Sequence, residues 1–140
     1  MEKRTGSYSR IHLHFVWRTK NSAPMMDEEI KRAVIGVFVS KAKDLQLELI
    51  EANGPEDHIH VLLKSPPTLA PSDIAKELKG SSSHFVNHVT LEGDRIRSLY
   101  WQDGFGVISV SPSAVKSVRE YIRRQIEHHR ENTLNEDLEI

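Results

Sequence analysis

Residues 10–18 have the sequence RIHLHFVWR, in which apolar and polar side chains alternate. The apolar positions of this alternation are Ile11, Leu13, Phe15 and Trp17. The intervening positions include His12 and His14. Because successive side chains of a strand point to opposite faces of a sheet, the pattern predicts a half-buried β-strand. We expect its apolar face in the core and both histidines on the other face.

Two further segments have the spacing of amphipathic helices. Between residues 27 and 45, apolar side chains recur at helical intervals at Ile30, Ala33, Val34, Val37, Phe38, Ala42 and Leu45. The acidic residues at 27–29 favour a helix N-terminus there. A Pro-Ser-Asp sequence at 71–73 predicts the start of a second helix, which continues to about Thr90. Its apolar positions are Ile74, Leu78, Phe85 and Val89.

Three more strands complete a sheet. Residues 45–52 and 57–64 alternate again, and the Asn-Gly-Pro sequence between them predicts an antiparallel hairpin. A fourth strand is predicted over 100–110, where Gly104 and Gly106 indicate a bulge or a close backbone approach. The resulting βαββαβ order predicts an α+β fold, a ferredoxin-like or RRM-like antiparallel sheet with two helices on one face.

An additional helix follows this unit. It is predicted to begin at Ser111-Pro112 and to continue to about His129. Tyr121, Gln125 and His128 form one row along its flank, which is a candidate functional face. More commonly, such a row consists of an aromatic side chain at the border of the core and an amide exposed to solvent. We expect a single domain over residues 1–130 and an acidic C-terminal tail over 131–140.

The composition narrows the chemistry. The chain has 140 residues, of which 38% are hydrophobic and 28% charged, as is typical of a soluble globular domain. It has no cysteine, which excludes a thiolate zinc site, a thiol nucleophile and a disulfide framework. The first residues contain no continuous apolar segment, so we expect a cytoplasmic protein without a signal peptide or membrane anchor.

The charge is unevenly distributed. The net charge is −1, yet four acidic and no basic residues occupy positions 131–140. The first 130 residues therefore carry about +3. This positive charge on residues 1–130 is compatible with a polyanionic partner.

The eight histidines form four close pairs, His12/His14, His58/His60, His84/His88 and His128/His129. His58 and His60 would project from one side of a strand, an arrangement that suits two ligands of one divalent cation. His12 and His14 have the same spacing, so spacing alone does not choose between the two pairs. The other two pairs lack a recognisable metal-binding pattern. We expect those four histidines to be structural or solvated.

Five segments carry a family resemblance when they are taken in order. They are HLHFVWRTK at 12–20, DHIHVLL at 57–63, LKGSS at 78–82, YWQDGF at 100–105 and VREYIRRQ at 118–125. Together they resemble the single-tyrosine HUH transposases of the insertion-sequence 200/605 type, a superfamily that includes the REP-associated tyrosine transposases. HUH denotes His, bulky hydrophobe, His, which residues 58–60 satisfy. The resemblance covers roughly residues 10–130.

The resemblance implies a site and a reaction. His58 and His60 would bind one Mg²⁺ or Mn²⁺, with Gln125 as a third ligand. Tyr121 would attack a phosphate of single-stranded DNA, giving a 5′-phosphotyrosine and a free 3′-hydroxyl. A later attack by another 3′-hydroxyl would rejoin the DNA, so that the reaction is a transesterification by a DNA strand transferase. Asp57 would orient a histidine, or it is a solvated turn residue.

The resemblance also implies partners. These are single-stranded DNA that carries a hairpin and a second copy of the chain, whose tyrosine helix completes the site; neither a nucleotide cofactor nor a membrane is implied. The candidate DNA contacts, some of which are plain solubilising charge, are Arg10, Arg18, Lys20, Lys79, Arg95, Arg97, Arg119, Arg123 and Arg124.

Two alternative functions remain open. One is a non-catalytic or domesticated ferredoxin-like protein that binds single-stranded nucleic acid by stacking. The aromatic residues available for stacking, Phe15 and Trp17, are however expected in the core. The other is a small metal-dependent hydrolase, in which water would replace Tyr121 as the nucleophile.

Overall fold

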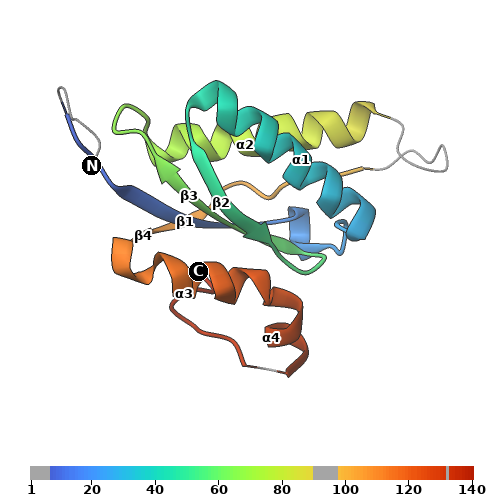
Figure 1. Cartoon of the computed structure of the whole chain (residues 1–140). Helices are drawn as coiled ribbons and strands as arrows, with labels where there is room; N and C mark the ends of the chain where they lie inside the picture. The colour runs from blue at the N-terminus through green and yellow to red at the C-terminus, as the bar shows by residue number, and fades with distance from the viewer. Residues whose placement is uncertain (1–6, 90–97, 132) are drawn as a thin grey trace.

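The computed structural model describes residues 7–89, 98–131 and 133–140. Its centre is a four-stranded antiparallel sheet in the order β2-β3-β1-β4 (Figure 1). The strands are β1 (Ile11–Arg18), β2 (Glu48–Asn53), β3 (His58–Ser65) and β4 (Gly106–Val110). With one helix after β1 and one after β3, this arrangement confirms the predicted α+β, ferredoxin-like class.

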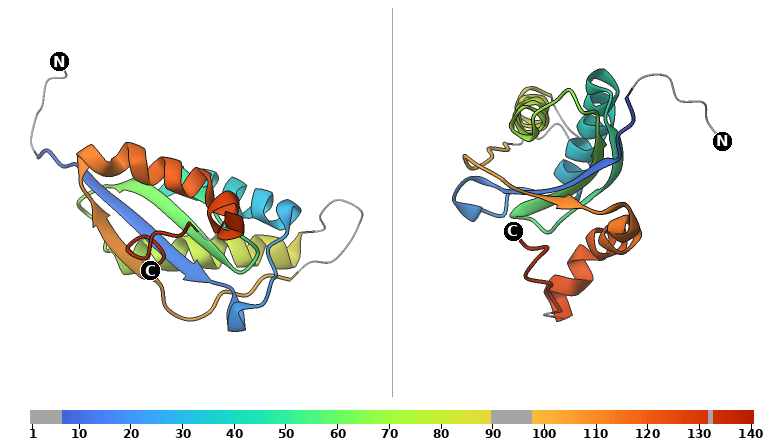
Figure 2. Two further views of the ribbon diagram at one scale, coloured as in Figure 1. Left: turned by 90° about the horizontal axis from the view of Figure 1, so that it is seen from below. Right: turned by 90° about the vertical axis from the view of Figure 1, so that its left-hand side faces the viewer.

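Two long helices, α1 (Glu28–Leu45) and α2 (Pro71–His88), cover one face of the sheet (Figure 2). The Asp27 carboxylate accepts a hydrogen bond from the Ile30 N–H at 2.9 Å, so the predicted acidic start of α1 is confirmed. The side chains between sheet and helices form the main core, which includes Phe15, Trp17, Phe38, Ile59, Ile74 and Leu78. The predicted end of the second helix at Thr90 lies outside the described residues.

The other face of the sheet is also covered. Helices α3 (Val115–Arg123) and α4 (Gln125–Glu131) lie over it together with residues 133–140 (Figure 2). Leu62 of β3 packs there against Val118 and Ile122 of α3. Consequently residues 13–17 of β1 are all buried. The prediction of a half-buried β1 was wrong, because the C-terminal part of the chain covers its second face.

The C-terminal helical region is broken where one continuous helix was predicted. A 3₁₀ turn (Pro112–Ala114) precedes α3, and Arg124 separates α3 from α4 with φ −100° and ψ 26°. These dihedral angles lie outside the helical range, so the chain changes direction there. Gln125, the first residue of α4, is fully buried instead of lying on an exposed flank.

The fourth strand is shorter than predicted. It begins at Gly106, and Trp101 forms only an isolated bridge with Thr19 before it. Gly104 has a φ of +90°, a conformation that glycine adopts at no steric cost and that interrupts a strand. A Cβ atom at Gly106 would lie 3.1 Å from the Ile140 side chain, which confirms a close approach at this glycine.

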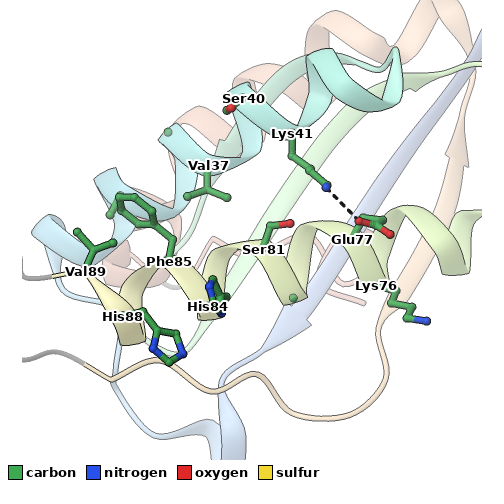
Figure 3. Close-up of a pocket in the computed structure, with 13 residues that line it drawn as sticks. Val37, Ser40, Lys41, Lys76, Glu77, Ser81, His84, Phe85, His88 and Val89 are labelled. Atoms are coloured by element: carbon green, nitrogen blue, oxygen red, sulfur yellow. Dashed lines mark ion pairs between the residues drawn. The ribbon is translucent and has the colours of Figure 1, made fainter.

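A hollow of about 910 Å³ lies between α1 and α2 (Figure 3). An ion pair between Lys41 and Glu77 at 3.2 Å crosses it, and Phe85 contributes apolar surface. His84 and His88 are exposed at its side, as expected for a surface pair. No helix in the described part of the chain is long and apolar enough to span a membrane.

Candidate active site

A group of polar side chains gathers on the face of the sheet that α3 and α4 cover. Its members, which we call the polar cluster, are His58, His60, Tyr121, Gln125, His129 and Glu139. Cross-strand partners share a face, and the register pairs Val16 with His60 and Arg18 with His58. The two β3 histidines therefore point away from the main core, toward the C-terminal elements. Both are buried, with 3% of His58 and 0% of His60 exposed.

His58 is held by its neighbour. Its Nδ1 atom lies 2.8 Å from the Asp57 carboxylate, which accepts the Nδ1–H. The lone pair is then on Nε2, which is the tautomer that a metal ligand needs. This Nε2 atom is buried and has no hydrogen-bond partner among the described residues. Asp57 thus makes the contact that an orienting residue would make.

His60 is held by a histidine of the neighbouring strand. Its Nδ1 lies 2.9 Å from Nε2 of His14, and the two rings stack with centroids 5.1 Å apart. Burial lowers the pKa of both histidines, that of His14 to about 4, because a low-dielectric interior disfavours the cation. Both are therefore neutral near pH 7. Of the two β1 histidines, His14 joins the site as a partner of His60. The sequence patterns had left the role of this pair open.

Tyr121 lies beside these histidines. Its ring centroid is 6.2 Å from that of His60, and its ring stacks on His128 at 4.5 Å. The hydroxyl donates to the Glu139 carboxylate and accepts a hydrogen bond from the Asn135 N–H at 3.0 Å. Burial and the hydrogen bond to Glu139 raise the pKa of Tyr121. The phenol is thus protonated at neutral pH and needs activation to act as a nucleophile.

Gln125 lies in the cluster with both its amide nitrogen and its amide oxygen hydrogen-bonded. The amide nitrogen donates to Glu139 at 3.1 Å, and the amide oxygen accepts from Nε2 of His129 at 3.2 Å. A role for Gln125 as a third metal ligand stays a prediction.

Glu139 and His129 also belong to the site, although the sequence patterns did not predict them. One carboxylate oxygen of Glu139 lies 3.3 Å from Nε2 of His58 and 3.2 Å from Nε2 of His60, and 3.5 Å separates it from His129. Burial opposes ionisation of Glu139, but its close contacts with His58 and His60 and the hydrogen bond from Tyr121 outweigh it and hold the pKa of this carboxyl below its usual range. A run of acidic residues looks like a solvated tail. The one signal in the sequence was the apolar pair Leu138 and Ile140 that flanks Glu139.

The predicted DNA contacts have different surroundings. Arg119 and Arg123 both pair with Glu51 at 3.3 Å. Arg124 pairs with Glu127, and Lys79 donates to the carbonyls of Gln102 and Gly104. The exposed members are Arg10, Arg18, Lys20, Arg119, Arg123 and Arg124, whereas Arg95 and Arg97 lie outside the described residues.

Arg18 has a notable position among these residues. It lines a hollow of about 490 Å³ together with His58, His129 and Glu139. A basic side chain thus lies at the mouth of the polar cluster.

The donor set suits a divalent cation. One ligand atom from each of His58, His60 and Glu139 lies within 4.8 Å of the others. Imidazole nitrogen and carboxylate oxygen together bind Mn²⁺ and similar ions. The unpartnered Nε2 of His58 is an independent indication, because a buried polar atom without a partner is costly.

The sequence profile of the family described as "Transposase IS200 like" matches residues 7–125. The chain belongs to this family. The matched range includes His58, His60, Tyr121 and Gln125, and it ends before Glu139. The IS200-like family membership confirms the resemblance inferred from the five segments, and with it a transposase of the single-tyrosine type.

Relatives and solved structures agree with the family. The chain is 26% identical to the ISDra2 transposase TnpA of Deinococcus radiodurans, over 89% of this chain and 91% of the relative. It is 29% identical to the transposase of insertion sequence element IS200 from Salmonella typhimurium, over 91% and 82% of the two chains. A crystal structure described as a transposase from Deinococcus radiodurans has a TM-score of 0.66 and 25% identity, covering 89% and 98% of the two chains.

A second solved structure shares the fold. It is a REP-associated tyrosine transposase bound to a REP hairpin, with a TM-score of 0.56 and 15% identity over 89% of this chain and 72% of the other.

Proposed function

We propose that this chain cleaves and rejoins single-stranded DNA at the ends of a mobile element by transesterification through Tyr121. The observation that carries the proposal is the position of the Tyr121 hydroxyl. It shares the Glu139 carboxylate with His58 and His60, so the nucleophile and the imidazoles surround one small volume. Family membership supports strand transfer as the class of reaction.

The residues fit a bound Mg²⁺ or Mn²⁺ ion. His58 and His60 would hold it, with Gln125 as the expected third ligand. When bound, such an ion polarises a non-bridging phosphate oxygen and stabilises the charge that develops during transfer. Asp57 and His14 keep the two imidazoles in the required tautomers through their Nδ1 contacts.

The protein supplies the nucleophile and its proton acceptor. The Tyr121 hydroxyl must leave its contacts with Glu139 and Asn135 before its oxygen can reach phosphorus. Glu139 is the nearest acceptor for the phenol proton. The phenol oxygen forms a bond to phosphorus while the bond from phosphorus to the 3′ oxygen breaks, and the departing 3′ oxygen takes up a proton from water. The phosphoester is conserved, so rejoining needs no ATP.

The proposed substrate is a single strand with a hairpin. Arg18, at the mouth of the cluster, would contact a backbone phosphate next to the cleavage point. The solved relative bound to a REP hairpin supports a hairpin as the recognised shape. Dimerisation remains part of the proposal, although each chain already brings Tyr121 beside its own His60.

The test uses a 5′-labelled and a 3′-labelled hairpin-bearing single strand with Mn²⁺. After denaturation we expect a covalent protein–DNA adduct that Tyr121→Phe abolishes. Tyr100→Phe is the matched control, because Tyr100 is 53% exposed and lies outside the cluster. If the DNA is cleaved without any adduct, and Tyr121→Phe still cleaves it, the result would indicate the metal-dependent hydrolase. Binding without cleavage would indicate the non-catalytic alternative.

A further inference from the structure

The tail over residues 133–140 is fixed to the body of the protein on both sides of Glu139. Leu138 packs against the cluster that contains Leu62, Val118 and Ile122. Ile140 approaches Gly106 of β4. The Leu138 and Glu139 N–H groups both donate to the Asn135 carbonyl at 3.0 Å. These contacts hold the Glu139 side chain toward the histidines rather than toward solvent.

The spacing of the donor atoms matches a shared ion. Two ligand atoms at right angles, each about 2.1 Å from one cation, lie about 3 Å apart. The same Glu139 oxygen is 3.3 Å from Nε2 of His58 and 3.2 Å from Nε2 of His60. The His58 atom makes no hydrogen bond at this distance and has no other partner among the described residues. Its lone pair is therefore available to an ion that the carboxylate also reaches.

The charge of Glu139 needs compensation. Its side chain is only 13% exposed, and burying a carboxylate is costly unless a positive charge accompanies it. The ion pairs that the structure describes for Glu139 run only to histidines. A divalent cation between the carboxylate and the imidazoles supplies the missing charge.

We propose that Glu139 is a metal ligand, supplied by the C-terminal tail to the ion that His58 and His60 bind. The inference rests on the proposed function for the kind of ion. The inference goes beyond the proposed function because it adds a ligand from outside residues 7–125, the part of the chain that the family profile matches. Docking of the tail and occupancy of the metal site are then linked.

The experiment measures Mn²⁺ binding to the full chain without DNA, from the electron paramagnetic resonance signal of free Mn²⁺. We expect Glu139→Gln to weaken Mn²⁺ binding roughly tenfold or more. The matched control is Glu136→Gln, which removes the same charge from an exposed position of the same tail and is expected to change the affinity by less than about twofold. Unchanged or tighter binding in Glu139→Gln would overturn the proposal.

A second measurement uses the unmodified chain, in case the variant disturbs the tail. Glutamate labelled with ¹³C at the side-chain carboxyl is incorporated, and pulsed electron resonance of bound Mn²⁺ detects a nearby ¹³C nucleus. We expect this coupling in the parent chain and in Glu136→Gln. Its absence from the parent chain would refute direct ligation.

The outcomes separate this inference from the proposed function. Mn²⁺ binding that depends on Glu139, without any DNA adduct, would keep the inference and remove the proposed reaction. A Tyr121 adduct together with Mn²⁺ affinity independent of Glu139 would keep the reaction and remove the inference.

Discussion

At the scale of single residues, the site depends on which ring nitrogen of each histidine carries the proton. For His60 to present a lone pair at Nε2, its Nδ1–H must donate to Nε2 of His14 at 2.9 Å. His14 belongs to β1 and His60 to β3, and the two side chains meet because the strands pair in this register. The alternation in residues 10–18 predicted the shared face of His12 and His14, but not which residue of β3 either would meet.

This contact leads to a prediction for His14. His14→Ala should weaken Mn²⁺ binding by roughly 10-fold to 100-fold, because His60 loses the acceptor that fixes its tautomer. His14→Gln should recover part of the affinity, since its amide oxygen can accept the same hydrogen bond. Calorimetric titration with Mn²⁺ measures both.

His12→Ala is the control, because His12 lies on the same strand face without a described contact to the polar cluster. Equal affinity in His14→Ala and the parent chain, with the fold intact, would exclude a positioning role for His14. A Gln variant no better than the Ala variant would do the same.

At the scale of elements, the β2–β3 hairpin sets where β3 begins and thus where His58 lies. The Asn-Gly-Pro sequence predicted this hairpin because glycine permits the backbone conformation of a tight turn. In the structure the glycine has a different role. Among the described glycines, only Gly104 has a positive φ. Gly54 is instead required by space, because a Cβ atom there would lie 2.2 Å from the carbonyl oxygen of His58.

Gly54→Ala should therefore destabilise the protein by about 2 kcal/mol or more, since backbone must shift to admit the methyl group. Mn²⁺ affinity should fall as well, because the displaced carbonyl belongs to His58 itself. Urea unfolding and Mn²⁺ titration measure the two effects.

Gly36→Ala is the matched control. Gly36 lies in α1 with nothing within 4 Å of the added atom, and alanine favours a helix over glycine by roughly 0.5–1 kcal/mol. It should leave stability unchanged or slightly higher. A Gly54→Ala variant as stable as the parent would contradict the account of the hairpin.

At the scale of the whole molecule, the second face of the sheet carries the candidate site, and it is the part that local sequence patterns predicted least. The order of strands and helices and the core face of β1 follow from periodicities within short segments. The choice of His58/His60 over His12/His14 came from the family resemblance, because both pairs have the same spacing. Contacts such as Glu139 with His60 join positions 79 residues apart, and no local pattern encodes them. The break at Arg124, which buries Gln125, likewise depends on the surface onto which α3 and α4 pack.

Because the docked tail carries Glu139, metal binding should make residues 133–140 more ordered. If Glu139 is a ligand, Mn²⁺ should slow amide hydrogen exchange within residues 133–140, where Leu138 and Glu139 donate to Asn135. Hydrogen-exchange mass spectrometry with Mn²⁺ and with a chelator measures this, and α1 peptides serve as the internal reference. Equal exchange of the tail under both conditions would show that tail and metal are not linked.

If Tyr121 becomes covalently bound to DNA, the bond itself can be located. The chain is incubated with a hairpin-bearing single strand and Mn²⁺, the DNA is trimmed with nuclease, and tryptic peptides are sequenced by mass spectrometry. We expect a 5′-phosphonucleotide on the peptide that contains Tyr121, with fragment ions that place it on the phenol oxygen. A nucleotide on another side chain, or cleaved DNA with every peptide unmodified, would contradict it.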